Sequence, residues 1–253
     1  MINLLKNQIK NFFNRFGYEL INKNQKIAEL SESDKDLINL VSNYSMTPQI
    51  RIFNLLQSLR HLKHKNIEGD YVECGVWKGG NLILFKKFLE NENQKEKKSI
   101  YAFDTFEGMT EPDKNDYDLS NHLDAIDLMK SDKNKSSNIW GVCSIENVKK
   151  NLSKNLKNLN GINLIKGPVE KTLTIKENIP DCISLLRLDT DWYSSTKKEL
   201  EVLYEKVTPG GIIIIDDYGH WGGAKKAVDE FFKDKYVWMH YVDYACRLII
   251  KDS

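Results

Sequence analysis

Two pairs of carboxylates follow apolar stretches of the sequence. Asp189 and Asp191 come directly after residues 183–188, and Asp216 and Asp217 come after a run of four isoleucines. Side chains two residues apart point to the same side of an extended chain, so the first pair shares one side. Four carboxylates at the ends of two buried strands repel one another unless a positive charge lies between them. A divalent metal such as Mg²⁺, which accepts an incomplete shell of carboxylate oxygens, is the simplest such charge.

A metal site of this kind indicates chemistry on a substrate hydroxyl. Bound Mg²⁺ lowers the pKa of a hydroxyl, and a carboxylate that the metal does not fully engage can accept the proton. The alternative is that Asp189 or Asp191 only caps a helix beginning near Ser194, which leaves the second pair unexplained. His220 and Trp221 follow the second pair and are candidates for a substrate pocket, although a lone histidine is equally typical of a surface loop.

A glycine-rich turn follows the first expected strand, residues 70–74. Gly75, Gly79 and Gly80 permit close approach of the backbone to a ligand, and the free amides of a helix N-terminus then face an anion. The spacing G-x-x-x-G-G is wider than the dinucleotide pattern G-x-G-x-x-G and suits an adenosyl ligand without a pyrophosphate. Asp104 ends the second strand, where an acid accepts hydrogen bonds from ribose hydroxyls. The competing interpretation is a structural turn with Asp104 as a cap.

These residues need an open α/β sheet to bring them together. Apolar runs predict seven strands, over residues 70–74, 99–103, 162–166, 183–188, 211–215, 237–243 and 246–251. Helical periodicity fits the intervening segments 79–90, 145–158, 194–206 and 222–233. This alternation predicts a mostly parallel, doubly wound, Rossmann-like sheet, and ligands then bind beyond the carboxyl ends of its strands. The short link Tyr244-Ala245 makes the last two strands antiparallel.

The chain divides into an N-terminal helical extension, residues 1–66, and an α/β domain, residues 67–253. The extension is expected to be helical over 1–23, 31–43 and 47–65. Ser31 through Asp34 can cap the second of these helices, and Thr47-Pro48 offers a cap and a first-turn proline for the third. Residues 107–140 form a long polar, aspartate-rich insertion, which is typical of a lid over a site or of a partly disordered segment.

The first helix is amphipathic and weakly basic. Its apolar side can lie on an anionic membrane surface, or it can pack on the domain or on a second subunit. We favour packing, because the three cations Lys6, Lys10 and Arg15 are few for recruitment to a membrane. The apolar surface of the extension is more than a small extension can bury alone, so we expect a homodimer.

The composition of the whole chain excludes several classes of protein. Its 253 residues hold 37 Lys and Arg and 36 Asp and Glu, a balance that argues against binding nucleic acid through bulk charge. No apolar run approaches the roughly 20 residues of a membrane span, so no integral membrane segment is expected. The N-terminus lacks the features of a signal peptide, and the four cysteines form no C-x-x-C pair. We therefore expect a cytoplasmic protein with reduced cysteines.

Several of these segments resemble the macrocin O-methyltransferase family, the TylF/MycF type of S-adenosylmethionine-dependent, metal-dependent sugar O-methyltransferases. The resemblance covers roughly residues 45–235. The matching segments are Gly69-Asp70-Tyr71-Val72-Glu73-Cys74-Gly75-Val76-Trp77-Lys78-Gly79-Gly80, Phe103-Asp104-Thr105-Phe106-Glu107-Gly108-Met109, Leu186 through Thr196, Pro209 through Tyr218, and Ala227 through Phe232. The resemblance implies the class I methyltransferase fold, with sheet order 3-2-1-4-5-7-6, and a methyltransferase domain over residues 67–253.

The resemblance also implies roles for particular residues. The residues expected to bind S-adenosylmethionine are Met46, Thr47, Glu73, Gly75, Trp77, Gly79, Gly80, Asp104, Thr105 and Phe106. Those expected to hold Mg²⁺ are Asp189, Asp216 and Asp217, and the base is expected to be the free carboxylate of the Asp189 and Asp191 pair, which we assign to Asp191. Those expected to contact the substrate are Tyr193, Tyr218, His220 and Trp221.

The acceptor and the reaction class leave alternatives open. Thr190 and Trp192 replace the Gly and Leu expected in antibiotic-tailoring members, and the insertion has no evident match in them. We therefore favour a sugar hydroxyl of a surface polysaccharide or a nucleotide-linked sugar over a natural-product sugar. The first rival is a metal-dependent glycosyltransferase, because Asp189-Thr190-Asp191 has the D-x-D form. The second is a non-catalytic methyltransferase-like scaffold recruited through the first helix.

Overall fold

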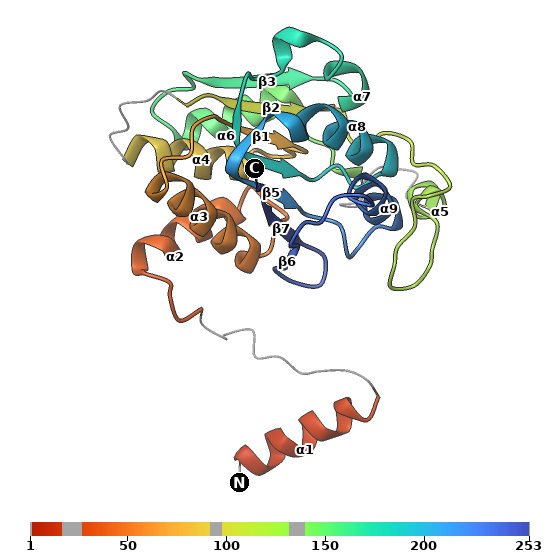
Figure 1. Cartoon of the computed structure of the whole chain (residues 1–253). Coiled ribbons are helices and arrows are strands. Elements are labelled where there is room, and N and C mark those ends of the chain that lie inside the picture. The colour runs from red at the N-terminus through yellow and green to blue at the C-terminus, as the bar shows by residue number, and fades with distance from the viewer. Residues whose placement is uncertain (1, 17–26, 92–97, 132–139, 253) are drawn as a thin grey trace. The chain divides into compact units, whose positions relative to one another are not determined.

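The strands pair into one mixed sheet, in which most of the pairings are parallel (Figure 1). The computed structural model describes residues 2–16, 27–91, 98–131 and 140–252. Within these residues seven strands run in the order β3-β2-β1-β4-β5-β7-β6. They are β1 (Asp70–Cys74), β2 (Ile100–Asp104), β3 (Ile162–Lys166), β4 (Ile183–Leu188), β5 (Val207–Ile215), β6 (His240–Tyr241) and β7 (Arg247–Ile250). The predicted α/β class, strand order and antiparallel final strands are confirmed.

The register of the sheet brings the candidate residues to one edge. Cys74 pairs with Phe103 on one side and with Leu188 on the other, and Leu188 pairs with Ile215. All three pairings are parallel, so the segments that follow β1, β2, β4 and β5 leave the sheet side by side. The central strands are buried on both faces, which explains why β4 and the isoleucine run of β5 lack polar alternation.

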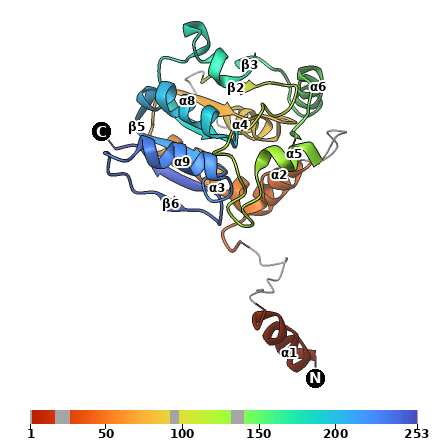
Figure 2. The same ribbon diagram turned by 90° about the vertical axis from the view of Figure 1, so that its right-hand side faces the viewer.

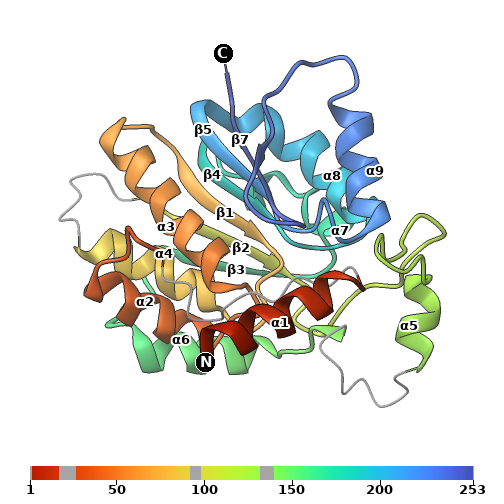
Figure 3. The ribbon, with the colours of Figure 1, turned by 90° about the horizontal axis from the view of Figure 1, so that it is seen from below.

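Helices cover both faces of this sheet (Figure 3). One layer contains α3 (Gln49–His64), α4 (Gly80–Asn91) and α6 (Ile145–Asn155), and the other contains α7 (Val169–Thr172), α8 (Tyr193–Leu203) and α9 (Gly222–Phe231). A cluster of buried side chains lies beneath α8 and α9 and includes Val72, Leu186, Leu200, Ile213 and Val228. Residues 36–66 belong to the same compact unit as the sheet, which spans 36–253.

The described part of the long insertion is held against α8 and α9. It contains α5 (Ala125–Ser131), which lies at the right of Figure 1 and faces the viewer in Figure 2. Ala125 and Met129 pack with Trp192, Trp221 and Ala224 in a small apolar cluster. The polar composition of this segment concealed that cluster, because its apolar partners come from distant parts of the chain. Residues 132–139 of the expected lid lie outside the described residues.

Residues 1–35 form a separate N-terminal unit. Helix α1 (Ile2–Asn14) is shorter than the predicted 1–23, of which residues 17–23 lie outside the described residues. Helix α2 (Glu32–Ser42) begins directly after Ser31. The Ser31 hydroxyl accepts a hydrogen bond from the Asp34 amide at 3.1 Å, as expected of a helix cap. None of the helices within the described residues is long and apolar enough to cross a membrane.

Several predicted boundaries are wrong by a few residues. Strand β6 lies at the sheet edge and has two residues instead of seven, paired with Leu248 and Arg247 of β7. Strand β5 begins at Val207 and runs through Pro209, where pairing with β4 is interrupted between Ile183 and Leu185. Helix α8 ends at Leu203 and is followed by a 3₁₀ turn, Tyr204–Lys206. A second 3₁₀ turn, Lys176–Asn178, precedes β4.

The predicted cap of α3 is also wrong. Pro48 occupies the N-cap position, and no side chain caps the helix. The hydroxyl of Thr47 accepts a hydrogen bond from the Arg187 guanidinium at 3.1 Å instead. A buried charged donor competes for that oxygen more strongly than a helix amide, which water can also satisfy.

Candidate active site

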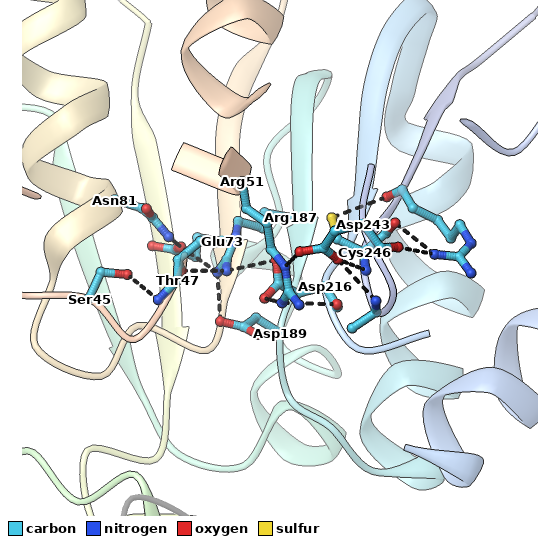
Figure 4. Close-up of polar contacts among 12 residues, drawn as sticks. Ser45, Thr47, Arg51, Glu73, Asn81, Arg187, Asp189, Asp216, Asp243 and Cys246 are labelled. Atoms are coloured by element: carbon cyan, nitrogen blue, oxygen red, sulfur yellow. Dashed lines mark hydrogen bonds and ion pairs between the residues drawn. The ribbon is translucent and has the colours of Figure 1, made fainter. Parts of the chain in front are cut away.

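Arg187 connects the ends of three strands beneath the site (Figure 4). It projects from β4, is 2 % exposed, and lies 2.9 Å from a Glu73 oxygen and 2.7 Å from an Asp189 oxygen. Its other terminal nitrogen lies 3.1 Å from Asp216. A buried guanidinium is stable only when carboxylates compensate it, and these three acids do so. Sequence reasoning missed Arg187, although a charged residue within an otherwise apolar buried strand is a detectable signal.

A second arginine holds the other side of Asp216. Arg51 comes from the first turn of α3 and is 8 % exposed. Its Nη1 lies 2.7 Å from Asp216 and its Nε lies 2.7 Å from Asp243. Burial alone would raise the pKa of Asp216, but the charges of Arg187 and Arg51 hold that pKa below its ordinary value. The sequence predicted that a metal alone supplies the positive charge among these acids. In the structure, two arginines supply part of that charge.

Three other carboxylates form the group that can hold a metal ion. One oxygen from each of Asp189, Asp191 and Asp217 lies within 4.8 Å of the others. Asp217 Oδ2 is buried and has no hydrogen-bond partner. Three carboxylates with an unpartnered buried oxygen are the donor set that a hard divalent cation takes. Asp216, expected as a ligand, lies between the arginines, and Asp191 stands in this group beside Asp189 and Asp217.

The environment of this group disfavours three negative charges. Burial raises the pKa of Asp189 and of Asp217 well above the ordinary value, and neighbouring carboxylates raise the pKa of Asp217 further. Burial also raises the pKa of Asp191 to about 7, against a hydrogen bond from Asp217 that lowers it. The backbone of Asp191 has φ of 68°, in the left-handed region, which is uncommon for a residue with a side chain. A cation between the three groups would remove the repulsion.

The glycine turn lies directly against the first acidic pair. Gly75 has φ of 90°, and a Cβ at this position would be 2.0 Å from the Asp189 carbonyl oxygen, so only glycine fits. The Asp104 carboxylate accepts the amides of Val76 at 2.7 Å, Trp77 at 3.0 Å and Phe106 at 2.7 Å. Asp104 therefore holds the turns after β1 and β2 and caps no helix, because α4 begins only at Gly80, and Asp104 also borders the cavity.

Glu73 supports the site from below. It is 1 % exposed and is absent from the cavity wall, and its Oε1 accepts hydrogen bonds from Asn81 at 2.8 Å and from Arg187. Burial raises the pKa of Glu73 to about 7 even though Arg187 opposes the rise. Its contacts orient Arg187 rather than a ligand.

A single cavity of about 480 Å³ joins the glycine turn to the acids. Of the predicted residues, the cavity wall includes Met46, Thr47, Gly75, Trp77, Asp104, Thr105, Asp189, Asp191, Asp216, Asp217, His220 and Trp221. Glu73, Gly79, Gly80, Phe106, Tyr193 and Tyr218 lie outside it. The two tyrosine hydroxyls donate instead to acids of α9, Tyr193 to Glu230 at 2.7 Å and Tyr218 to Asp229 at 2.7 Å.

The two unusual residues around the first acidic pair each have a structural partner. The Thr190 hydroxyl donates to Glu199 of α8 at 2.8 Å, which fixes the segment between Asp189 and Asp191. The indole of Trp192 donates to the carbonyl of Thr110 at 3.0 Å and packs edge-on against Trp221. Trp192 therefore helps to attach the insertion to the domain.

The strand order, the glycine turn after β1 and the cavity at the carboxyl ends define a class I methyltransferase fold. The sequence profile of Macrocin-O-methyltransferase (TylF) matches residues 3–248. The chain therefore belongs to this family, which confirms the resemblance and the expected class, that of the O-methyltransferases.

Individual proteins agree with this assignment. The chain is 31 % identical over 182 residues to demethyldecarbamoylnovobiocin O-methyltransferase of Streptomyces niveus, a match covering 72 % of this chain and 64 % of that protein. It is 27 % identical over 181 residues to 8-demethyl-8-(2,3-dimethoxy-alpha-L-rhamnosyl)-tetracenomycin-C 4'-O-methyltransferase of Streptomyces olivaceus, covering 69 % and 62 %. Each match spans less than two thirds of the relative's length. The structure of the O-methyltransferase NovP superposes with a TM-score of 0.69, at 26 % identity and 83 % coverage of both chains.

Proposed function

We propose that this protein transfers a methyl group from S-adenosylmethionine to a hydroxyl of a sugar, with Mg²⁺ as its metal. The observation that carries the proposal is the shared cavity, in which the glycine turn lies against Asp189 and the three-carboxylate group opens beside it. Family membership supports methyl transfer over the D-x-D glycosyltransferase, and the retained acids argue against a non-catalytic scaffold.

Different residues of the cavity wall would hold the cofactor and the metal. Gly75, Trp77 and Asp104 border the part that would take the cofactor, and Asp189 and Asp217 beside it would supply oxygens for the metal. When bound, S-adenosylmethionine supplies the methyl group and Mg²⁺ lowers the pKa of the acceptor hydroxyl. Asp216 stays between Arg51 and Arg187, where its negative charge holds both guanidinium groups in place.

Asp191 is the residue that we assign as base. Its burial raises its pKa to about 7, so near neutral pH a carboxylate oxygen can accept the proton of the acceptor hydroxyl. Its position within the metal-binding group makes a third metal contact the competing role. His220 and Trp221, which border the cavity beyond Asp217, would contact the sugar.

The acceptor class rests on the family and on the wall of the cavity. The relatives' names describe natural-product acceptors, and one of them names a rhamnosyl group. The wall formed by Trp221 and by Thr110 and Asp118 of the insertion argues for a different acceptor within the sugar class, and we propose a surface-polysaccharide or nucleotide-linked sugar. A cytoplasmic location and a homodimer remain proposals, which cell fractionation and gel filtration test.

Calorimetric titration of S-adenosylmethionine, with and without Mg²⁺, tests the proposal first. We expect saturable binding in the wild type and in Asp191→Asn. We expect methyl transfer from labelled cofactor to at least one sugar of a glycoside and sugar-nucleotide panel in the wild type, and strongly reduced transfer in Asp191→Asn. Asp229→Asn, which changes an acid of α9 outside the cavity, is the matched control and should retain both activities. Absence of cofactor binding in every condition would contradict the proposal.

A further inference from the structure

An exposed aromatic ring lies against two residues of the cavity wall. Tyr244 is 61 % exposed, and its ring lies edge-on to His220, with 6.0 Å between ring centroids. The Arg51 guanidinium carbon lies 5.7 Å from the centre of the same ring. His220 and Arg51 both border the cavity, so the exposed Tyr244 ring contacts two residues of its wall from outside.

The backbone that carries this ring is firmly held. Asp243 Oδ1 accepts the amides of Ala245 at 3.0 Å and Cys246 at 2.8 Å, while its Oδ2 binds Arg51. The Gly219 amide donates to the Ala245 carbonyl at 2.9 Å, and a Cβ on Gly219 would be 1.9 Å from the Tyr244 carbonyl oxygen. An exposed ring on a fixed backbone loses little conformational entropy when it binds a ligand.

The volume of the cavity indicates what would reach this ring. A cavity of about 480 Å³ falls in the lower half of the range of roughly 300–1,000 Å³ that holds one drug-sized ligand. The cofactor would take the part beside the glycine turn, so the rest accommodates little more than the sugar that carries the reacting hydroxyl. Any group that is linked to that sugar must therefore extend out of the cavity.

We propose that Tyr244 forms a second acceptor subsite, in which its ring stacks on the apolar face of a sugar linked glycosidically to the sugar that is methylated. This inference rests on the proposed function and deepens it, because it makes the acceptor an oligosaccharide or polysaccharide. An aromatic ring offers a flat apolar surface to the C–H groups of a pyranose, while its hydroxyl stays in water. Sequence reasoning missed Tyr244 because it lies in a link between two short strands.

Paired acceptors test the subsite directly. Methyl transfer is measured for the methyl glycosides of rhamnose, glucose and galactose and for the matching disaccharide glycosides, with S-adenosylhomocysteine affinity as the control for folding. In the wild type we expect a KM for the accepted disaccharide about five- to tenfold below that for its monosaccharide. Tyr244→Ala should abolish this difference, Tyr244→Phe should retain it, and kcat on the monosaccharide should stay unchanged in both.

The control variant and the contrary results are equally specific. Tyr236→Ala removes a ring that is 93 % exposed in the same C-terminal segment and outside the cavity wall, and should leave both KM values unchanged. Equal KM values for the two acceptors, or a difference that survives in Tyr244→Ala, would overturn the subsite and leave the proposed function standing. A wild type that binds the cofactor but methylates none of the glycosides would overturn the sugar acceptor, and the subsite with it.

Discussion

At the scale of single residues, the site depends on how burial distributes charge among its acids. Asp216 lies between two arginines and keeps a low pKa, whereas Asp191 has none of those contacts in the described structure and its pKa rises to about 7. Asp216, outside the three-carboxylate group, and Asp191, within it, thus have opposite environments. That separation allows one to act as a fixed countercharge and the other to accept a proton near neutral pH.

The assignment of Asp191 as base predicts a separation of catalysis from binding. Asp191→Asn keeps the shape of the side chain and removes its basicity, so we expect kcat to fall by about 10²- to 10⁴-fold. Cofactor affinity, measured by calorimetry, should change little because Asp191 lies on the acid side of the cavity. A variant with nearly full kcat would exclude Asp191 as the base.

The burial of Glu199 leads us to expect that the stability of the protein depends on pH. It is fully buried, and burial raises its pKa well above the ordinary 4.5, although a hydrogen bond from Thr190 opposes the rise. The folded state therefore keeps a proton that the unfolded chain releases. The stability from the neutral acid is complete below pH 4.5 and is lost as the pH rises toward the folded-state pKa, by about 1.4 kcal/mol for each unit of pKa difference.

Glu199→Gln should remove this dependence. The amide of glutamine is neutral at every pH, so the free energy of unfolding of the variant relative to the wild type should increase from pH 5 to pH 8. Urea unfolding at several pH values measures the difference, and groups common to both proteins cancel in it. Glu201→Gln, an exposed neighbour on the same helix, is the control. A difference that does not change with pH would show that Glu199 is ionised in the folded protein.

At the scale of elements, the insertion is attached through the first turns of α8 and α9. Asp116 is 1 % exposed and accepts a hydrogen bond from the Tyr193 amide at 2.8 Å. It also packs against Gly223, where an added Cβ would be only 1.8 Å from Asp116 Oδ1. Trp192 binds the same segment at Thr110. Residues 110–125 therefore form a fixed wall beside the acids rather than a freely moving cover over them.

Gly223→Ala should separate this wall from the helices. The added methyl group must displace the buried Asp116 carboxylate, and we expect a loss of about 1–3 kcal/mol in the free energy of unfolding. Acceptor KM should rise while cofactor affinity stays near that of the wild type, because Asp116 contacts Tyr193 and Gly223 and lies outside the cavity wall. Lys225→Ala, which removes an exposed ion pair on the same helix, should cost less than about 1 kcal/mol. Equal effects of the two variants would contradict this account.

At the scale of the whole molecule, the metal should couple chemistry to stability. Asp189, Asp191 and Asp217 approach one another from the ends of two strands, so an ion among them relieves repulsion present only in the folded chain. Binding restricted to the folded state stabilises it by about 2.7 kcal/mol at a hundredfold excess over Kd. The melting temperature of the cofactor-free protein should rise on addition of Mg²⁺ and fall back on chelation.

Asp217→Asn distinguishes this linkage from a nonspecific effect of salt. The variant loses a ligand and much of the repulsion, so its melting temperature should start higher and respond little to Mg²⁺. Asp229→Asn should respond as the wild type does, since its carboxylate binds Tyr218 and Lys225 outside the cavity. An identical Mg²⁺ response in all three proteins would contradict a metal site at these acids.

The sequence by itself determined the sheet and the chemical types at its carboxyl edge. Apolar runs, the glycine turn and acids at strand ends are local signals, so β1, β3 and β4 were predicted to the residue, and Asp189, Asp191 and Asp217 were singled out. The tertiary structure alone decided which charges meet. Arg187 and Arg51 pair with Asp216, Thr47 turns from its helix to Arg187, and Tyr193 and Tyr218 turn to α9, because these contacts join segments distant in sequence, and burial decides which of them form.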